Sequence, residues 1–252
     1  MNLKEITDIA LSVGEILLSN GSENYRIETS INKICEAYGL ISEVILTSNG
    51  ILLLVEDSNL NKYTSIRKVK EKCVDLYKIE LINSFSRKIT KAPMTYEEAK
   101  KAIDEIRNAP TFTFRVRTFA SCMTGFIYTL FFNGTFLDAL TSILVCLITY
   151  IVFEKMNKLG FIQFIDYYIA GIIIGLLSVL GNFFFPEINK NNVITGSIMI
   201  LVPGVILTNS IKDMLYGDYS SGASKFFEAA LIIAAVGCGV LSALIIGLKG
   251  FW

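Results

Sequence analysis

Residues 193–231, VITGSIMILVPGVILTNSIKDMLYGDYSSGASKFFEAAL, decide how this chain is organised. The stretch begins as an apolar run long enough to enter a bilayer, but Pro203 and Gly204 interrupt the run near its middle. Proline removes a hydrogen bond from a helix, and the carbonyl groups that it releases must face protein or water when the surroundings are lipid. A transporter places its binding site at such a break, so the interruption predicts a polar site.

The polar residues after the break have a plainer alternative. Pro203 could merely kink a packed helix, because Pro and Gly are common in membrane helices, and residues 210–225 could form a solvated loop. Asp213 and Asp218 would then lie in water. The residues alone leave both interpretations open.

The composition is that of a membrane protein. The chain has 252 residues, 52% of them hydrophobic, and a mean hydropathy of +0.53, which an ordinary soluble domain does not reach. Most charged residues precede residue 118, so we expect an α+β domain over residues 1–110 and a membrane domain over residues 111–252. The formal net charge is zero, and no basic patch is interleaved with aromatic residues, which argues against a nucleic-acid partner.

Residues 1–110 alternate between helical and strand-like patterns. The predicted helices cover residues 3–19, 23–38, 75–89 and 96–108, and the predicted strands cover residues 43–48, 51–56 and 62–67. Thr95 and Glu98 form a capping pair at the start of the last helix. Asn49 and Gly50 suit the positive dihedral angles of a type I′ turn and predict a hairpin.

Five apolar segments follow, each close to the ~20 residues that cross a bilayer core. They cover residues 114–132, 136–153, 161–184, 193–209 and 226–248. Basic residues in short flanks set the orientation, and they lie mainly on the side of the N-terminal domain. The predicted fold is an α-helical membrane protein with five transmembrane helices, a cytoplasmic α+β domain and an external C-terminus.

Two carboxylates lie within these segments. Asp166 is about one turn inside the third segment and Glu228 is at the start of the fifth. Carboxylates are costly in lipid and usually face a cavity or a partner, so both are candidates for a proton or substrate relay. The alternative for each is a group at the interface whose carboxylate reaches water.

The sequence lacks the patterns of an enzyme. It has no histidine, which excludes an imidazole base and removes the commonest zinc ligand, and it has no nucleophile motif or glycine-rich phosphate loop. We therefore expect no catalytic residue, no cofactor and no metal. Glu23 and Arg26, three residues apart on a predicted helix, are expected to pair locally or to dock the N-terminal domain on the membrane part.

Three groups of residues stand out, in this order along the chain. They are Gly14-Glu15, Asn20-Gly21, Glu23, Tyr25-Arg26 and Glu28; then Asn83, Ser86 and Arg87; then Leu201-Val-Pro-Gly, Asn209, Lys212-Asp213, Gly217-Asp218, Ser221-Gly222, Lys225 and Glu228-Ala229. In type and spacing they resemble the bacterial threonine/serine exporter family, specifically its amino-terminal half. Lys212 and Lys225 stand where the resemblance implies Arg, which preserves charge but not bidentate anion binding.

The resemblance implies a multi-pass plasma-membrane exporter subunit for threonine, serine or a similar small polar metabolite, working as a proton-coupled secondary transporter. The alternative within transport is a small dicarboxylate such as succinate, because a zwitterion and a dianion both need a site for a carboxylate. Two alternatives belong to other classes of protein: a membrane-anchored enzyme that uses the N-terminal domain, and a membrane scaffold. Split relatives work with a second small multi-span membrane subunit, so we expect such a partner or an oligomer.

Three sets of site residues follow. The expected transport path is Pro203, Gly204, Asn209, Asp213 and Asp218; the candidates for ion coupling are Asp218, Glu228 and Asp166; and the motif of the N-terminal domain is Gly14, Glu15, Gly21, Glu23, Tyr25 and Arg26. In the path, the amide of Asn209 both donates and accepts hydrogen bonds, and Asp213 is expected to attract the ammonium group of an amino acid.

Overall fold

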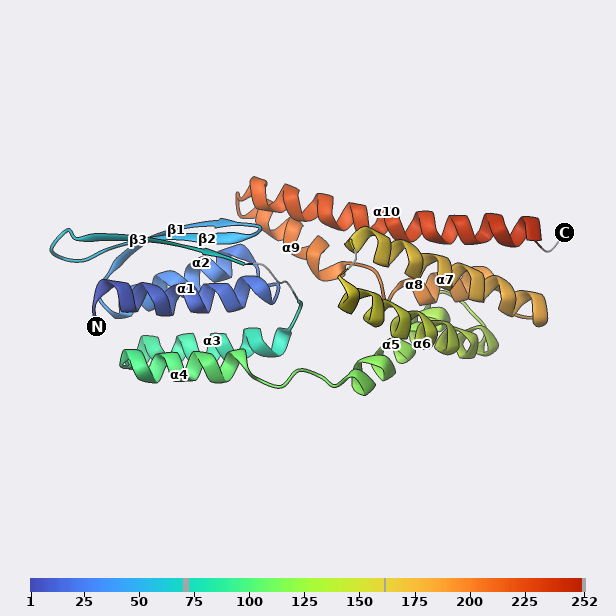
Figure 1. Cartoon of the computed structure of the whole chain (residues 1–252), viewed down its shortest axis with the longest axis horizontal. Helices are drawn as coiled ribbons and strands as arrows, with labels where there is room; N and C mark the ends of the chain where they lie inside the picture. Colours follow the sequence, from blue (N-terminus) through green and yellow to red (C-terminus); the bar gives the residue numbers. More distant parts are fainter. Residues whose placement is uncertain (70–72, 161, 251–252) are drawn as a thin grey trace. The chain divides into compact units, whose positions relative to one another are not determined.

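The computed structural model describes residues 1–69, 73–160 and 162–250. They divide into two compact units, each described here by itself (Figure 1). The head unit consists of Met1–Thr111 with Gly204–Phe227, and the bundle unit consists of Phe112–Pro203 with Glu228–Trp252. A segment from late in the chain is therefore part of the head unit.

The head unit combines a three-stranded sheet with helices. Its elements are α1 (Leu3–Ser19), α2 (Asn24–Ala37), β1 (Ile41–Thr47), β2 (Gly50–Glu56), β3 (Lys62–Lys68), α3 (Leu76–Lys91), α4 (Tyr96–Arg107), α9 (Gly204–Leu215) and the start of α10 (Tyr219–Gly250). The strand order is β1-β2-β3, with both pairs antiparallel. The helices and strands predicted for residues 1–110 are confirmed, and their ends differ by at most two residues.

The caps explain where two of these helices begin. The Asn2 side chain accepts a hydrogen bond from the Glu5 backbone N–H at 2.8 Å, and the Glu5 carboxylate accepts one from the Asn2 backbone N–H at 2.9 Å. Thr95 and Glu98 form the same reciprocal arrangement at the start of α4, as predicted. Each box satisfies backbone donors that the helix itself leaves without partners.

The hairpin is present, but the prediction of its turn was wrong. Thr47 pairs with Gly50, so the two turn residues are Ser48 and Asn49. Among the described non-glycine residues, a positive φ occurs at Leu60 and Asn133, so the turn is not type I′. Gly50 instead lies in the central strand, where a Cβ would lie 3.2 Å from the Arg67 carbonyl oxygen. Because Gly50 has no side chain, β2 and β3 can approach each other closely at this position.

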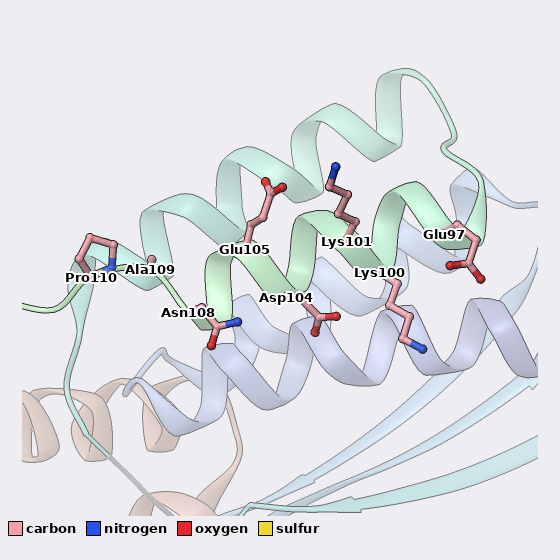
Figure 2. Close-up of a pocket in the computed structure, with 8 residues that line it drawn as sticks. All are labelled: Glu97, Lys100, Lys101, Asp104, Glu105, Asn108, Ala109 and Pro110. Carbon is pink, nitrogen blue, oxygen red and sulfur yellow. The ribbon is translucent and has the colours of Figure 1, made fainter.

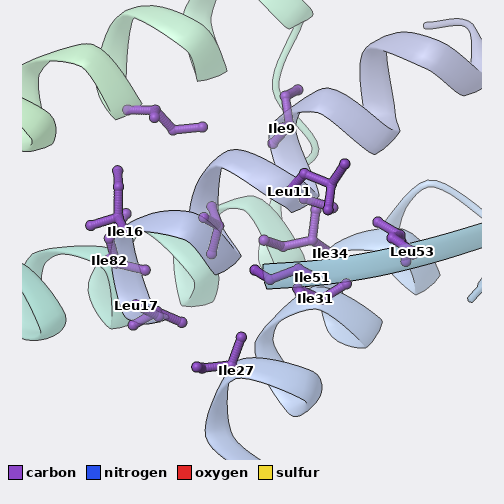
Figure 3. Close-up of a cluster of buried hydrophobic side chains, with 14 of the residues drawn as sticks. Ile9, Leu11, Ile16, Leu17, Ile27, Ile31, Ile34, Ile51, Leu53 and Ile82 are labelled. Atoms are coloured by element: carbon purple, nitrogen blue, oxygen red, sulfur yellow. The ribbon is translucent and has the colours of Figure 1, made fainter. Parts of the chain in front are cut away.

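The core of the head unit lies between α1, α2 and the central strand. In Figure 1, α1 and α2 lie between the sheet and the α3–α4 pair. Figure 3 shows Ile9, Leu17, Ile31, Ile51 and Leu53 among the side chains that meet there, and all five are buried. A Cβ at position 14 of α1 would lie 2.8 Å from a terminal carbon of each of two isoleucines, on α2 and β2, so glycine lets these elements approach.

The bundle unit is helical. Its elements are α5 (Phe114–Phe131), α6 (Phe136–Leu159), α7 (Gln163–Phe184), α8 (Lys190–Ile198) and the rest of α10. Small residues bring α7 and α10 together: a Cβ at Gly171 would lie 2.5 Å from the Val236 carbonyl oxygen, and one at Gly175 would lie 2.5 Å from the Ala243 side chain.

Three helices of the described chain are long and apolar enough to cross a membrane, fewer than the five predicted. They are Phe136–Leu159, Gln163–Phe184 and Tyr219–Gly247. The first predicted segment forms α5, which has 18 residues and carries Arg115 and Arg117 in its first turn. Residue 161, the first of the third predicted segment, lies outside the described residues.

The fourth predicted segment, 193–209, is not one helix. α8 ends at Ile198 and α9 begins at Gly204, so the interruption predicted at Pro203 and Gly204 is confirmed. Proline lacks the N–H that would continue the helix, and the chain leaves helical geometry before it. The solvated-loop alternative is wrong, because residues 204–215 are helical and Asn209, Ser210 and Asp213 are buried.

Candidate functional site

A buried carboxylate from α9 caps the start of α2. Glu23 occupies the N-cap position of α2, but its side chain makes no capping hydrogen bond. The Asn24 backbone N–H instead donates to Asp213 Oδ1 at 3.1 Å. Asp213 is 1% exposed. An anion is stabilised at a helix N-terminus by the unpaired N–H groups and the helix dipole, so Asp213 ties α9 to α2.

Lys225 and the Asn24 side chain complete this contact. The Lys225 ammonium lies 2.6 Å from Asp213 Oδ2 and 3.0 Å from Asn24 Oδ1. The Asn24 amide nitrogen donates to Asp218 Oδ2 at 2.8 Å. Asn24 was not among the predicted site residues. Its position between Glu23 and Tyr25 of the motif was the available signal, because an amide there can donate to one group and accept from another.

A second ion pair lies at the same end of α2. The Lys212 ammonium is 2.7 Å from Glu23 Oε1, and Arg26 Nε is 2.9 Å from Glu23 Oε2, which confirms the predicted local pair of Glu23 and Arg26. Burial by itself raises the pKa of Glu23, but the hydrogen bond from Lys212 and the charge of Arg26 outweigh it, and the pKa lies below its ordinary value of 4.5. The bond to Glu23 raises the pKa of Lys212.

The two arms of the α9–α10 hairpin (residues 204–227) are fixed to each other. Gly217 adopts a φ of +91° at the turn, and Asp218 Oδ1 accepts the Ser221 backbone N–H at 3.0 Å. The Ser210 hydroxyl donates to the Gly222 carbonyl at 2.8 Å. Burial raises the pKa of Asp218, but hydrogen bonds from Ser221 and Asn24 lower it by more than burial raises it, so the pKa lies below its ordinary value.

Two further contacts join the hairpin to the loop before α2 and to its first turn. The Asn209 amide nitrogen donates to the Gly21 carbonyl at 2.8 Å, and the rings of Tyr25 and Tyr216 stack with centroids 4.2 Å apart. The latch network, as we call it, comprises Glu23, Asn24, Arg26, Lys212, Asp213, Asp218 and Lys225. Its three carboxylates are matched by three cations.

Other predicted site residues lie elsewhere. Gly14 packs in the core, and Glu15 lies 3.1 Å from Arg67 and 3.0 Å from Arg107. Pro203 is the last residue of its segment in the bundle unit and Gly204 is the first residue of its segment in the head unit, and neither belongs to the latch network.

Two predicted site residues, Asp166 and Glu228, belong to the bundle unit. Asp166 on α7 is 4% exposed, and its Oδ1 atom has no hydrogen-bond partner in the described part of the chain. Glu228 is half-buried on α10.

A hollow of about 650 Å³ runs along α4 of the head unit (Figure 2). Lys101 and Glu105 point to one side of α4, whereas Lys100 and Asp104 point to the other. Side chains that diverge in this way do not converge on a ligand. No group of three or more acidic or cysteine side chains in the described residues is placed to hold a metal ion.

The geometry can be compared with known proteins. Residues 8–247 match the family model described as "Putative threonine/serine exporter". The chain belongs to the threonine/serine exporter family. The family is one of exporters and not of enzymes. Within the matched residues, Glu23 and Asn24 meet Lys212 and Asp213 in the head unit.

Relatives fall into two groups by length. The "Threonine/serine exporter" of Corynebacterium glutamicum is 24% identical over 93% of this chain and 50% of the relative. The "Probable threonine/serine exporter" of Mycobacterium tuberculosis is 19% identical over 97% of this chain and 46% of the relative. The "Probable succinate transporter subunit YjjP" of Escherichia coli is 23% identical over 98% of this chain and 97% of the relative. The chain thus spans about half the length of the first two. No solved structure shows a significant match.

Proposed function

We propose that the chain is a subunit of a plasma-membrane exporter that moves threonine, serine or a similar small polar metabolite out of the cell. The observation that carries this proposal is the latch network. Residues from the two ends of the family match, such as Asn24 and Lys225, meet through buried charges. A charged contact between a polar head and the helix that follows a Pro-Gly break is a device for opening and closing a path.

The network then acts as a closed gate. The ammonium group of Lys225 pairs with the Asp213 carboxylate. An amino acid carries an ammonium group too. The path runs along Pro203, Gly204, Asn209, Asp213 and Asp218, and a substrate ammonium reaches Asp213 once Lys225 withdraws. Exchange of one ammonium for another leaves the buried carboxylate paired throughout, which avoids the cost of an unpaired charge.

Five passes through the membrane remain our proposal, with the head cytoplasmic and the C-terminus external. α6, α7 and α10 provide three passes, α5 a fourth, and α8 with the turn after it the fifth. α8 has nine residues and covers only about 14 Å, too short to cross lipid alone. It packs against α5, α6 and α7, and such contacts with protein are what an interrupted span requires.

Ion coupling is proposed to use Asp218, Glu228 or Asp166. Asp218 is the weakest of the three in this conformation, because its lowered pKa opposes proton uptake. Asp166 and Glu228 lie in the bundle unit, where a carboxylate is costly and is kept for function.

Succinate is the second candidate substrate, because relatives that align over nearly their whole length are named as succinate transporter subunits. The word subunit in those names, and the double length of the named exporters, support a second small membrane subunit as partner. A homo-oligomer is the alternative to that partner.

The test uses cells that lack their own threonine and succinate exporters. Cells producing this chain with its membrane partner are loaded with both metabolites, and extracellular threonine, serine and succinate are followed by mass spectrometry. Export of threonine or serine that depends on the chain supports the proposal. Succinate export alone favours the second candidate, and export of none of them, with the chain present in the membrane, refutes both.

A further inference from the structure

An apolar groove of about 510 Å³ lies between α5 and α6 of the bundle unit. Its walls include Phe119 and Met123 of α5 and Leu147 and Ile151 of α6. Among the described residues that line it, only Arg115 carries a charge. Since α6 is long and apolar enough to cross a membrane, a groove along it is exposed to lipid acyl chains.

The groove has the length of one leaflet of a bilayer. Its lining extends from residue 114 to residue 123 on α5 and from residue 143 to residue 151 on α6. At about 1.5 Å per residue, these stretches cover about 14 Å and about 12 Å of helix. One leaflet contributes about 15 Å of hydrocarbon, half the thickness of a bilayer core. The groove therefore has room for much of one acyl chain.

An ion pair between the two helices lies at one end of the groove. Arg117 Nη2 on α5 is 2.9 Å from Glu154 Oε1 on α6, so the first turn of α5 is level with the last turns of α6. The Lys158 ammonium lies 3.9 Å from the same carboxylate oxygen. Arg117 and Lys158 thus share the negative charge of Glu154.

Two more cations lie at this end of the groove. Arg115 lines it, and Lys155 is four residues after Ile151, one turn further along nearly the same face of α6. Both side chains are exposed, and neither forms an ion pair within the described residues.

The rest of the groove lacks basic residues. Between residues 118 and 153 the sequence contains no Lys or Arg, and its one carboxylate is Asp138, at the start of α6. Four cations thus gather around one carboxylate at a single end of an apolar groove. This arrangement is complementary to a molecule with a negatively charged head and a hydrocarbon chain.

We propose that this groove binds an anionic phospholipid, with one acyl chain between α5 and α6 and the phosphate between Arg115 and Lys155. The inference goes beyond the proposed function, because it does not depend on which metabolite the protein exports. Basic sites between membrane helices bind anionic headgroups, and in the proposed orientation this site faces the cytoplasmic leaflet, which is negatively charged. A zwitterionic lipid binds less well, because its own cation is repelled by the two basic side chains.

A native cysteine reports on the groove directly. Cys122 is half-buried in the groove wall, so a bound acyl chain should slow its reaction with an uncharged maleimide. Cys238, an exposed residue on α10, should react at the same rate with and without lipid. Because this measurement needs no substitution, it stands even if a variant fails to fold.

The experiment uses the purified full chain in detergent, with its membrane partner where one co-purifies. Phosphatidylglycerol is titrated in, native mass spectrometry counts the bound lipid molecules, and the labelling rates of Cys122 and Cys238 are measured in the same samples. Phosphatidylglycerol should be retained and should protect Cys122 but not Cys238. Equal rates for Cys122 with and without the lipid overturn the assignment.

Substitutions test the two cations. Arg115→Gln and Lys155→Gln should each weaken phosphatidylglycerol binding about 5-fold, and the double variant should weaken it roughly 25-fold. Arg115→Lys keeps the charge and should bind nearly as the wild type does. Lys158→Gln is the matched control, because Lys158 is a cation of the same helix end that already shares Glu154; its effect should stay below about 2-fold. Wild-type affinity in the double variant contradicts the proposal.

Three other probes separate the parts of the lipid. Phosphatidylcholine has the chains without a net charge, diacylglycerol has the chains without a phosphate, and glycerol 3-phosphate has the phosphate without chains. Each should protect Cys122 much more weakly than phosphatidylglycerol does. Equal protection by either of the first two would show a groove that is merely apolar, and equal protection by the third would show a site for a soluble anion.

A protein helix is the other possible occupant of the groove. Cysteine at Phe119, an exposed groove residue, should not crosslink to a second copy of the chain or to the membrane partner. A crosslink formed there in the membrane, with phosphatidylglycerol failing to compete, would assign the groove to a protein contact and refute the lipid site.

Discussion

At the scale of single residues, Asn24, Asp213 and Lys225 bind one another across about 190 and 200 positions of sequence. Asp213 and Lys225 could be singled out from the sequence, because charges in an otherwise apolar stretch stand out. Their contact with Asn24 could not be predicted. Nothing local in residues 20–28 indicates that the first amide of α2 needs an anion from residue 213, since the cap comes from another element instead of from the N-cap side chain.

Lys225→Met should open the start of α2. The Asp213 side chain is fully buried, and a buried carboxylate that loses its cation costs about 3–5 kcal/mol. Hydrogen exchange of the Asn24 amide measures this loss directly. Lys225→Arg should retain most of the protection, and Lys158→Met should change little, because Lys158 is an exposed residue 3.9 Å from its partner. Wild-type protection in Lys225→Met would show that the pair does not hold α2.

Acid should weaken the latch network through Glu23. Its pKa is lowered on folding, so its contribution to stability is present above the ordinary value of 4.5 and is lost as the pH falls through the lower folded value. The melting temperature of the wild type should therefore fall more steeply below pH 5 than that of Glu23→Gln, which has no carboxylate to protonate. Parallel curves for the two proteins would mean that Glu23 contributes nothing.

At the scale of elements, local signals were good predictors where local physics decides. Capping boxes at Asn2 and Thr95 and the break before Gly204 could be read from the sequence. The turn at Ser48-Asn49 could not, because the place of Gly50 in the central strand depends on β3.

Pro203→Ala should slow export. Alanine restores the N–H that proline lacks, which lets the segment between α8 and α9 continue its helical hydrogen bonds and removes the break. Initial efflux rates at matched membrane abundance test this, with Pro186→Ala as the control, because Pro186 lies in the exposed turn after α7. An unchanged rate in Pro203→Ala would mean that the break has no part in transport.

At the scale of the whole molecule, composition correctly predicted a membrane protein with a polar N-terminal part. The number of spans was harder to predict, because a hydropathy window treats α5 and the segment containing α8 as equivalent to α6. The head unit also includes residues 204–227. Their place there depends on contacts between distant parts of the chain, which hydrophobic periodicity cannot predict.

The proposed orientation predicts opposite labelling at two exposed positions. In a chain without the exposed Cys73 and Cys238, cysteine at Glu97 should react with an impermeant maleimide only after the cells are permeabilised. Cysteine at Asn191, at the start of α8, should react in intact cells. The reverse pattern would place the head outside the cell.

The most direct measurement of the central claim is efflux from liposomes that contain only the purified chain and its membrane partner. Liposomes preloaded with labelled L-threonine should release the label well above the rate of empty liposomes, and those with Asp213→Asn or with the chain alone should release it slowly. Release at the empty-liposome rate by the complete wild-type assembly, with succinate equally retained, would contradict the claim that this chain is an exporter.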